Sequence, residues 1–114
     1  MKSIKISIIT CTFNSELFLE NALKSIENQS YLNIEHIIND GYSTDSTLKI
    51  INEYIERNKN RYVIKFFQSD PKGVGNALNV ATEVATGDVV HYLHSDDYYL
   101  DRDSLNKVAD YFHK

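Results

Sequence analysis

Four apolar runs alternate along this chain with four amphipathic stretches, and this alternation limits the folds that the chain can adopt. The runs are rich in β-branched residues and predict strands over residues 4–10, 34–38, 62–67 and 88–93. Apolar residues recur three and four positions apart in the other stretches, which predicts helices over about 15–28, 43–56, 73–86 and 105–112. Alternating strands and helices form parallel sheets through βαβ crossovers. We therefore expect one α/β domain, a Rossmann-like three-layer sandwich with a mainly parallel sheet of about four strands and helices on both faces.

Polar and glycine residues mark where these elements begin and end. Asn14 or Ser15 can cap the first helix, because a short polar side chain accepts from the free backbone N–H groups of the first turn. The segment Asn39-Asp40-Gly41 has the composition of a turn after the second strand. Gly87 is a candidate left-handed cap for the third helix.

Length, charge and cysteine content exclude several classes of protein. A chain of 114 residues predicts one domain, residues 1–114. The net charge of −4 argues against nucleic acid as a partner, because phosphate binding draws on clustered Lys and Arg. Cys11 is the only cysteine, so no internal disulfide can form and a reducing compartment is expected. No secretory leader or membrane span is predicted.

A ligand is expected at the carboxyl ends of the predicted strands, because open parallel sheets bind ligands beyond those ends. Four loops follow the strands, at residues 11–14, 39–41, 69–73 and 94–97. Three of these loops carry carboxylates, at Asp40, Asp70 and the adjacent pair Asp96 and Asp97. Solvent-facing helix positions could carry the same charges, so acids gathered at strand ends indicate a ligand that needs them.

Asp96 and Asp97 can be interpreted in two ways. Adjacent carboxylates repel each other unless water or a cation lies between them. Mg²⁺ is typically held by one or two carboxylates together with ligand phosphates, which predicts a metal that bridges the protein to a diphosphate. The plainer interpretation makes the pair turn and N-cap residues of the last helix. The pair alone leaves both interpretations open.

The other loop residues also have a functional and a structural interpretation. Asp40 could accept an N–H from a base such as uracil, or it could belong to a plain turn. Phe13 could lie against a base or pack in the core, and Lys72 could bind phosphate or be solvated. Cys11 and His94 lie near the same end of the sheet, where packing roles are the alternative.

Several common nucleotide and metal motifs are absent from the sequence. Gly73-Val74-Gly75 lacks the third glycine of the dinucleotide fingerprint and follows the third strand instead of the first. There is no Walker sequence, and the histidines lack metal-ligand spacing with cysteine. These absences argue against a different Rossmann-like enzyme.

The four loops together resemble one family. Residues 8–14, 39–47, 73–79 and 95–97 resemble family 2 glycosyltransferases of the GT-A fold in their order and spacing, across nearly the whole chain. The likeness is to bacterial enzymes that build capsule, O-antigen or exopolysaccharide chains. It implies an inverting transferase that moves a sugar from a nucleotide-diphosphate sugar, usually a UDP-sugar, to a glycan or lipid-linked acceptor. It also implies a cytoplasmic location, with the cytoplasmic face of the membrane as the alternative.

The resemblance also implies roles for individual residues. Phe13 matches the aromatic residue beside the base, and Asp40 matches the acid that reads the uracil ring. Asp96 matches an acid near the ribose and metal, and Asp97 matches the ligand of Mg²⁺ or Mn²⁺ in a DXD-like motif. The remaining nucleotide-binding candidates lie in the same loops: Cys11, Thr12, Asp70 and Lys72.

The sequence departs from the family pattern at several positions. Cys11 stands where many members have Pro, and Asn39 stands where many have Asp. Tyr42 is inserted between the usual Gly and Ser. Leu78 replaces an Arg found in many members, which favours an alternative function: a degenerate or truncated module that binds nucleotide or a partner without catalysis.

Length implies that part of the catalytic site lies elsewhere. Family members normally continue well beyond this length, and the continuation carries the acceptor pocket and the general base. No acid here is placed by motif to reach an acceptor hydroxyl. We expect a fragment of a longer transferase, inactive in isolation, with an exposed sheet edge and apolar face that favour homo-oligomers.

Overall fold

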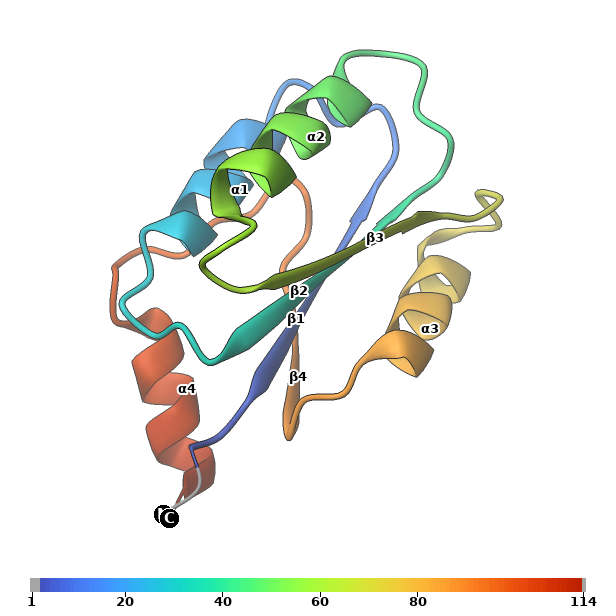
Figure 1. The fold of residues 1–114 in the computed structure, drawn as a ribbon. Helices are drawn as coiled ribbons and strands as arrows, with labels where there is room; N and C mark the ends of the chain where they lie inside the picture. Colours follow the sequence, from blue (N-terminus) through green and yellow to red (C-terminus); the bar gives the residue numbers. More distant parts are fainter. Residues whose placement is uncertain (1–2, 114) are drawn as a thin grey trace.

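The computed structural model describes residues 3–113, which form one parallel sheet with helices on both faces (Figure 1). The elements in chain order are β1 (Ile6–Thr12), α1 (Leu19–Glu27), β2 (Ile34–Asp40), α2 (Thr47–Asn58), β3 (Val63–Gln68), α3 (Val74–Val84), β4 (Val89–Tyr92) and α4 (Ser104–His113). The predicted succession of strand and helix units is confirmed. None of the helices within residues 3–113 has the length and apolar character needed to cross a membrane.

The strands lie in the order β3-β2-β1-β4, and every neighbouring pair is parallel. Thr12 pairs with Asp40, and Asp40 pairs with Gln68, so β1, β2 and β3 end at the same level of the sheet. The chain moves outward from β1 to β3 and then returns to place β4 on the other side of β1. The strand order therefore reverses beside β1, which is where open parallel sheets bind ligands.

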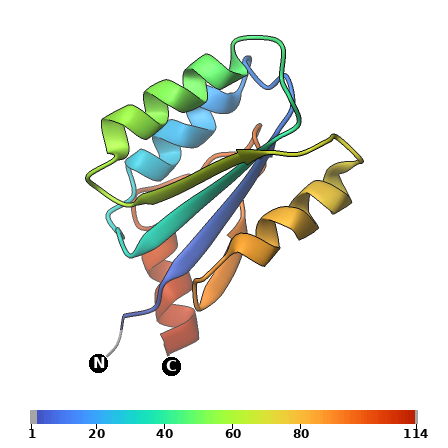
Figure 2. The same ribbon diagram turned by 45° about the vertical axis from the view of Figure 1, so that its right-hand side comes forward.

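One apolar layer on each face of the sheet holds the helices. The larger layer includes Leu23, Tyr54 and Leu105, and it packs α1, α2 and α4 against one face. The smaller layer includes Ile9 and Ala81, and it packs α3 against the other face (Figure 2). Because both faces are covered, β1 and β2 are buried along almost their whole length, as their β-branched sequences predict. The three-layer arrangement is confirmed.

Several element boundaries differ from the prediction. β1 covers residues 6–12, two positions later than expected. β2 continues through Asn39 and Asp40, which are strand residues and not a turn. α1 begins at Leu19, because residues 16–18 form a turn and the Leu19 N–H donates to the carbonyl of Ser15. Neither Asn14 nor Ser15 caps α1 through its side chain.

Gly87 does not have the left-handed backbone that the sequence suggested, since Gly73 is the only described glycine with a positive φ. Its small size serves a close approach instead. A Cβ on Gly87 would lie 2.5 Å from the Oγ of Ser7 and 2.8 Å from the backbone nitrogen of Ser7. The Gly87 N–H donates to that Oγ at 2.8 Å. Glycine is required here because the chain entering β4 passes directly against β1.

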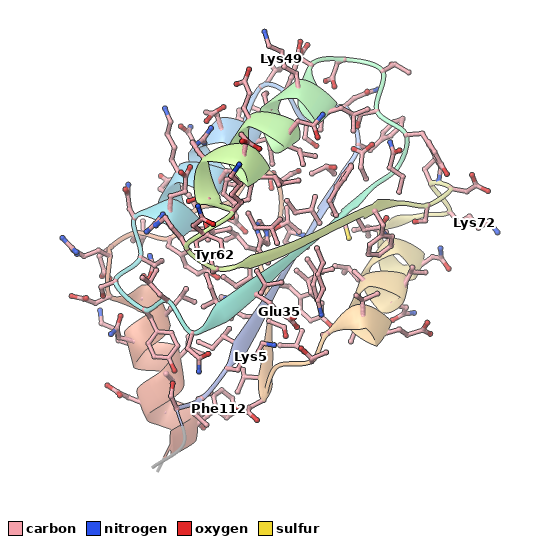
Figure 3. The ribbon with its side chains drawn as sticks, viewed as in Figure 1. Lys5, Glu35, Lys49, Tyr62, Lys72 and Phe112 are labelled. Atoms are coloured by element: carbon pink, nitrogen blue, oxygen red, sulfur yellow. The ribbon has the colours of Figure 1, made fainter. Side chains whose placement is uncertain are left out.

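The buried acid Glu35 of β2 lies beside this contact and binds residues of β1 and β3. The carboxylate of Glu35 accepts from the Ser7 hydroxyl at 2.6 Å and from the Thr86 N–H at 2.6 Å. The ammonium groups of Lys65 and Lys5 lie 2.8 and 3.5 Å from it, and Figure 3 shows Lys5 beside Glu35. Although burial opposes ionisation, hydrogen bonds from Lys65, Ser7 and Thr86 lower the pKa of Glu35 to about 2. Glu35 is therefore a charged structural residue, on the same face of the sheet as α3.

The edge of the sheet at β4 is exposed in the part of the chain that the structure describes, where β4 pairs with β1 alone. A groove of about 390 Å³ lies between β4 and α4, and Tyr111 and Phe112 are exposed in its lining. The predicted exposed edge and apolar face are thus present. Oligomer formation through them stays a prediction.

Candidate functional site

A cavity of about 260 Å³, the strand-end pocket, lies at the carboxyl ends of β1 and β2 beside the start of α3. Its lining comes from three strand-end segments and α3: Cys11, Thr12, Phe13, Asn39, Gly41, Ser69, Asp70, Pro71, Gly73, Val74 and Ala77. Four residues predicted from the sequence therefore meet in it, namely Cys11, Thr12, Phe13 and Asp70. A larger cavity of about 490 Å³, lined by the end of α1, Arg61 and residues 99–102, contains none of the predicted site residues.

The walls of the strand-end pocket suit a flat, largely apolar group. Phe13 is 56% exposed, so its core interpretation is wrong and its ring is available at the pocket. A Cβ on Gly41 would lie 3.2 Å from the Cβ of Pro71 and 3.4 Å from the Cδ1 of Phe13. The missing side chain leaves room between these two walls. Ligand pockets typically combine such apolar walls with a few placed polar groups.

Asp40 is fully buried and does not line the strand-end pocket. The hydroxyls of Thr12 and Ser43 donate to its Oδ1 at 2.6 and 2.5 Å. The Ser43 N–H and the Gln68 amide donate to its Oδ2 at 2.8 and 3.1 Å. Although burial opposes ionisation, hydrogen bonds from Ser43, Thr12 and Gln68 hold the pKa of Asp40 below its ordinary value. Asp40 is therefore a charged structural residue that connects the strand ends through hydrogen bonds, and its acceptor positions are already occupied.

Asn39 is a buried polar residue among the pocket residues that were not predicted from the sequence. It is 1% exposed and lines the strand-end pocket. Its amide nitrogen donates to the Ala77 carbonyl at 3.1 Å, and its amide oxygen accepts from the Ser69 hydroxyl at 2.9 Å. An amide can make about twice this number of hydrogen bonds, so donor and acceptor capacity remains. Strand alternation could have predicted that Asn39 lines the pocket and Asp40 does not, because consecutive strand residues lie on opposite faces of the sheet.

Cys11 lies in the pocket wall and is partly buried. Burial raises the pKa of its thiol to about 11. The thiol therefore stays protonated at neutral pH, and since the thiolate is the reactive form, Cys11 is not an activated nucleophile. Its interpretation as a small residue at the pocket is supported.

Asp96 and Asp97 follow β4 and are both exposed. Neither carboxylate has a hydrogen bond or ion pair with another residue in the described part of the chain. The Asp97 N–H donates to the His94 carbonyl at 3.0 Å, which forms a turn. α4 begins only at Ser104, so the pair does not form its N-cap. The turn itself is compatible with either interpretation of the carboxylates.

The carboxylates of Asp96 and Asp97 are suitable ligands for a hard divalent cation, provided that a bound molecule supplies further oxygen ligands. Within residues 3–113, no cluster of three or more His, Cys, Asp or Glu side chains could hold a metal ion. The protein offers two unpaired carboxylates, and Mg²⁺ is commonly held by one or two carboxylates plus phosphate oxygens and water. A site of this kind is completed by the ligand.

Lys72 lies outside this arrangement. It is exposed in the loop between β3 and α3 and points away from the molecule (Figure 3), and it does not line the strand-end pocket. Gly73, the next residue, lines the pocket with a φ of +95°, a backbone conformation that favours glycine.

Comparison with known proteins agrees with this geometry. Residues 7–114 match the family model described as glycosyl transferase family 2. An uncharacterized glycosyltransferase of Haemophilus influenzae is 40% identical over 106 residues, which are 93% of this chain and 41% of that protein. A GalNAc(5)-diNAcBac-PP-undecaprenol β-1,3-glucosyltransferase of Campylobacter jejuni is 35% identical over 98 residues, which are 84% of this chain and 31% of that protein.

A solved structure has the same fold. The crystal structure of residues 1–349 of TarS from Staphylococcus aureus, in complex with UDP-GlcNAc, superimposes with a TM-score of 0.83 at 32% identity. The superposition covers 96% of this chain and 31% of that chain. This chain thus spans less than half the length of the proteins that it matches. The fold, the family match and these relatives together show that the chain belongs to glycosyl transferase family 2.

Proposed function

We propose that this chain is the donor-binding part of an inverting glycosyltransferase that uses a nucleotide-diphosphate sugar, with a UDP-sugar favoured. One observation carries the proposal: a pocket for a flat group and a pair of unpaired carboxylates lie at carboxyl ends of strands on the two sides of the point where strand order reverses. A nucleoside diphosphate has a flat base at one end and a charged diphosphate at the other, which suits both features.

The base is proposed to occupy the strand-end pocket, with its ring against Phe13. Stacking on an aromatic side chain contributes about 1–3 kcal/mol per base. Thr12, Cys11 and Asp70 complete the pocket lining. Asp40 reaches the base only if one of its present donors turns away, so its first role is to hold the Thr12 hydroxyl in place.

The diphosphate is proposed to lie toward Asp96 and Asp97. Asp97 would bind Mg²⁺ or Mn²⁺, and Asp96 would contact both the metal and the ribose. The metal would neutralise charge on the departing diphosphate. Lys72 could reach a phosphate by swinging inward, because its side chain is exposed and has no partner in the described part of the chain.

The donor and acceptor classes draw on the relatives. TarS is solved with UDP-GlcNAc, which supports a UDP-sugar here. The name of the C. jejuni enzyme includes PP-undecaprenol, which supports a glycan or lipid-linked acceptor here. Action in the cytoplasm, with the cytoplasmic face of the membrane as the alternative, is part of the same proposal. The residue that deprotonates the acceptor hydroxyl is proposed to lie outside these 114 residues, since no acid here is placed by motif for that role and the chain covers 41% and 31% of the H. influenzae and C. jejuni relatives.

One observation favours a second function, a nucleotide-binding module without catalysis. Leu78 packs against the apolar layer that includes Ile9 and Ala81. A cation at this position is therefore replaced by core packing, and the site lacks one positive charge near the ligand.

Calorimetry separates these functions. UDP, GDP and dTDP would be titrated with and without Mn²⁺ into the wild type, Asp97→Ala and Asp110→Ala. Asp110 is a matched control, because it is exposed on α4 and its carboxylate has no described partner. UDP binding that Mn²⁺ strengthens, and that only Asp97→Ala weakens, supports the proposal. Metal-independent binding supports the second function, and a folded protein that binds none of the three nucleotides contradicts both.

A further inference from the structure

The segment between β4 and α4 carries Asp96 and Asp97 and is fixed at both ends. At its start, the Leu93 N–H donates to the Ile9 carbonyl at 2.9 Å. At its far end, the Gln29 amide donates to the Asp101 carbonyl at 2.6 Å, and the Ser30 N–H donates to the Arg102 carbonyl at 2.8 Å. Residues 94–98 form an arch between these two anchors.

A further contact fixes the arch at Tyr99. The Tyr99 hydroxyl lies 2.8 Å from the Nδ1 of His91, within hydrogen-bond distance. The two rings stack, with centroids 5.6 Å apart and an angle of 22° between their planes. Tyr99 also packs against the larger apolar layer of the core. Because His91 is a β4 residue, this contact joins the arch directly to the sheet.

We infer that His91 and Tyr99 are positioning residues, whose contact holds the arch at residues 94–98 so that Asp96 and Asp97 face the ligand in one arrangement. This inference rests on the proposed function, in which the two carboxylates bind a metal together with a diphosphate. Carboxylates that are already placed lose less conformational freedom when the metal binds. The contact should therefore strengthen the metal-dependent part of nucleotide binding and leave the strand-end pocket unaffected.

The chain offers a matched pair of tyrosines for the test. Tyr99→Phe removes the hydroxyl that contacts His91 and keeps the ring stack and the core packing. Tyr98→Phe removes a hydroxyl from the adjacent residue, which is 57% exposed and has no hydrogen-bond partner within residues 3–113. His91→Phe removes the same hydrogen bond from the other side.

Two measurements are made on each variant. The first is amide hydrogen exchange at residues 94–98 in the metal-free protein. The second is the ratio of UDP affinities with and without Mn²⁺. We expect Tyr99→Phe and His91→Phe to speed exchange and to lower the ratio about fivefold, with affinity in the absence of Mn²⁺ unchanged. The double variant should be no worse than either single variant, and Tyr98→Phe should behave as the wild type.

Failure of this inference is distinct from failure of the proposed function. If the wild type binds UDP with a clear Mn²⁺ effect but Tyr99→Phe leaves the ratio unchanged, the positioning role is wrong. It is also wrong if exchange at residues 94–98 does not change. If the wild type binds no nucleotide, the proposed function fails, and with it the metal-positioning role; exchange then reports only whether Tyr99 holds the arch.

Discussion

The hydroxyl of Thr12 donates a 2.6 Å hydrogen bond to the buried carboxylate of Asp40, and this contact joins the last residues of β1 and β2. Thr12 lines the strand-end pocket, whereas Asp40 does not. The shape of the pocket floor therefore depends on a charge that lies outside the pocket. Ser43, in the loop before α2, and Gln68, at the end of β3, donate to the same carboxylate. The positions of these two segments therefore also depend on the charge of Asp40.

Replacing the Asp40 carboxylate by an amide should destabilise the fold. In Asp40→Asn, the amide nitrogen cannot accept from the donors that now bind Oδ1 or Oδ2, and buried donors are left unpaired. The free energy of unfolding should fall by about 2–4 kcal/mol, measured by urea denaturation. Asp110→Asn, at an exposed helix position, should stay within about 0.5 kcal/mol of the wild type. An equally small change in Asp40→Asn would show that these hydrogen bonds do not hold the strand ends.

Two glycines should respond to alanine with opposite signs. In Gly87→Ala, the added Cβ would lie 2.5 Å from Ser7 Oγ and 2.9 Å from the Lys5 carbonyl oxygen, so the backbone must move at a cost of about 1–3 kcal/mol. In Gly75→Ala, no atom lies within 4 Å of the new Cβ, and α3 should gain about 0.5–1 kcal/mol. Thermal melts of both variants test this pair. A neutral Gly87→Ala would contradict the close approach of the chain to β1.

The buried carboxylate of Glu35 should make stability depend on acid pH. Its pKa is lowered from 4.5 to about 2 in the folded protein, so it adds stability that is complete above about pH 5 and is lost as pH falls toward 2. The contribution is of the order of 3 kcal/mol. Since Asp40 adds a slope of the same sign, the measurement is the difference in unfolding free energy between the wild type and Glu35→Gln from pH 7 to 3. A difference that does not shrink toward pH 3 would refute the role of the charge.

Phe13 should contribute to nucleotide affinity and little to stability. Its ring is 56% exposed at the strand-end pocket, and Phe18 has the same exposure but does not line the pocket. Phe13→Ala should weaken UDP binding about tenfold through loss of stacking, and Phe18→Ala should leave it unchanged. Equal effects of the two substitutions would place the base elsewhere.

The strands and helices could be predicted because their signals are local. Continuous β-branched residues and helical spacing identified every element of the sheet and its crossovers. The residues at which elements begin and end were harder to predict from the sequence. Asn39 and Asp40 have turn composition, yet they extend β2 because Thr12 and Gln68, from neighbouring strands, satisfy the carboxylate. Those donors are distant in sequence from Asp40, so no local sequence pattern predicts these hydrogen bonds.

The site was predicted in part for the same reason. The rule on strand ends found Cys11, Thr12, Phe13 and Asp70, which the pocket brings together. It could not show whether a strand-end side chain faces the pocket, since Asn39 and Asp40 differ only in the face of the sheet that they occupy. Gly87 likewise has the composition of a helix cap, and only its non-local contact with Ser7 gives its actual role.

Alkylation of Cys11 tests the central claim, nucleotide binding in the strand-end pocket, most directly. Cys11 is the only cysteine and lines that pocket, so the rate of its reaction with a small maleimide reports on pocket occupancy without any need for activity. Burial raises the pKa of the thiol to about 11, so the reaction is followed at mildly alkaline pH, with urea-unfolded protein as the reference. UDP with Mn²⁺ at about ten times its dissociation constant should slow the reaction about tenfold. An unchanged rate, with calorimetry showing that UDP is bound, would place the nucleotide elsewhere and contradict the account.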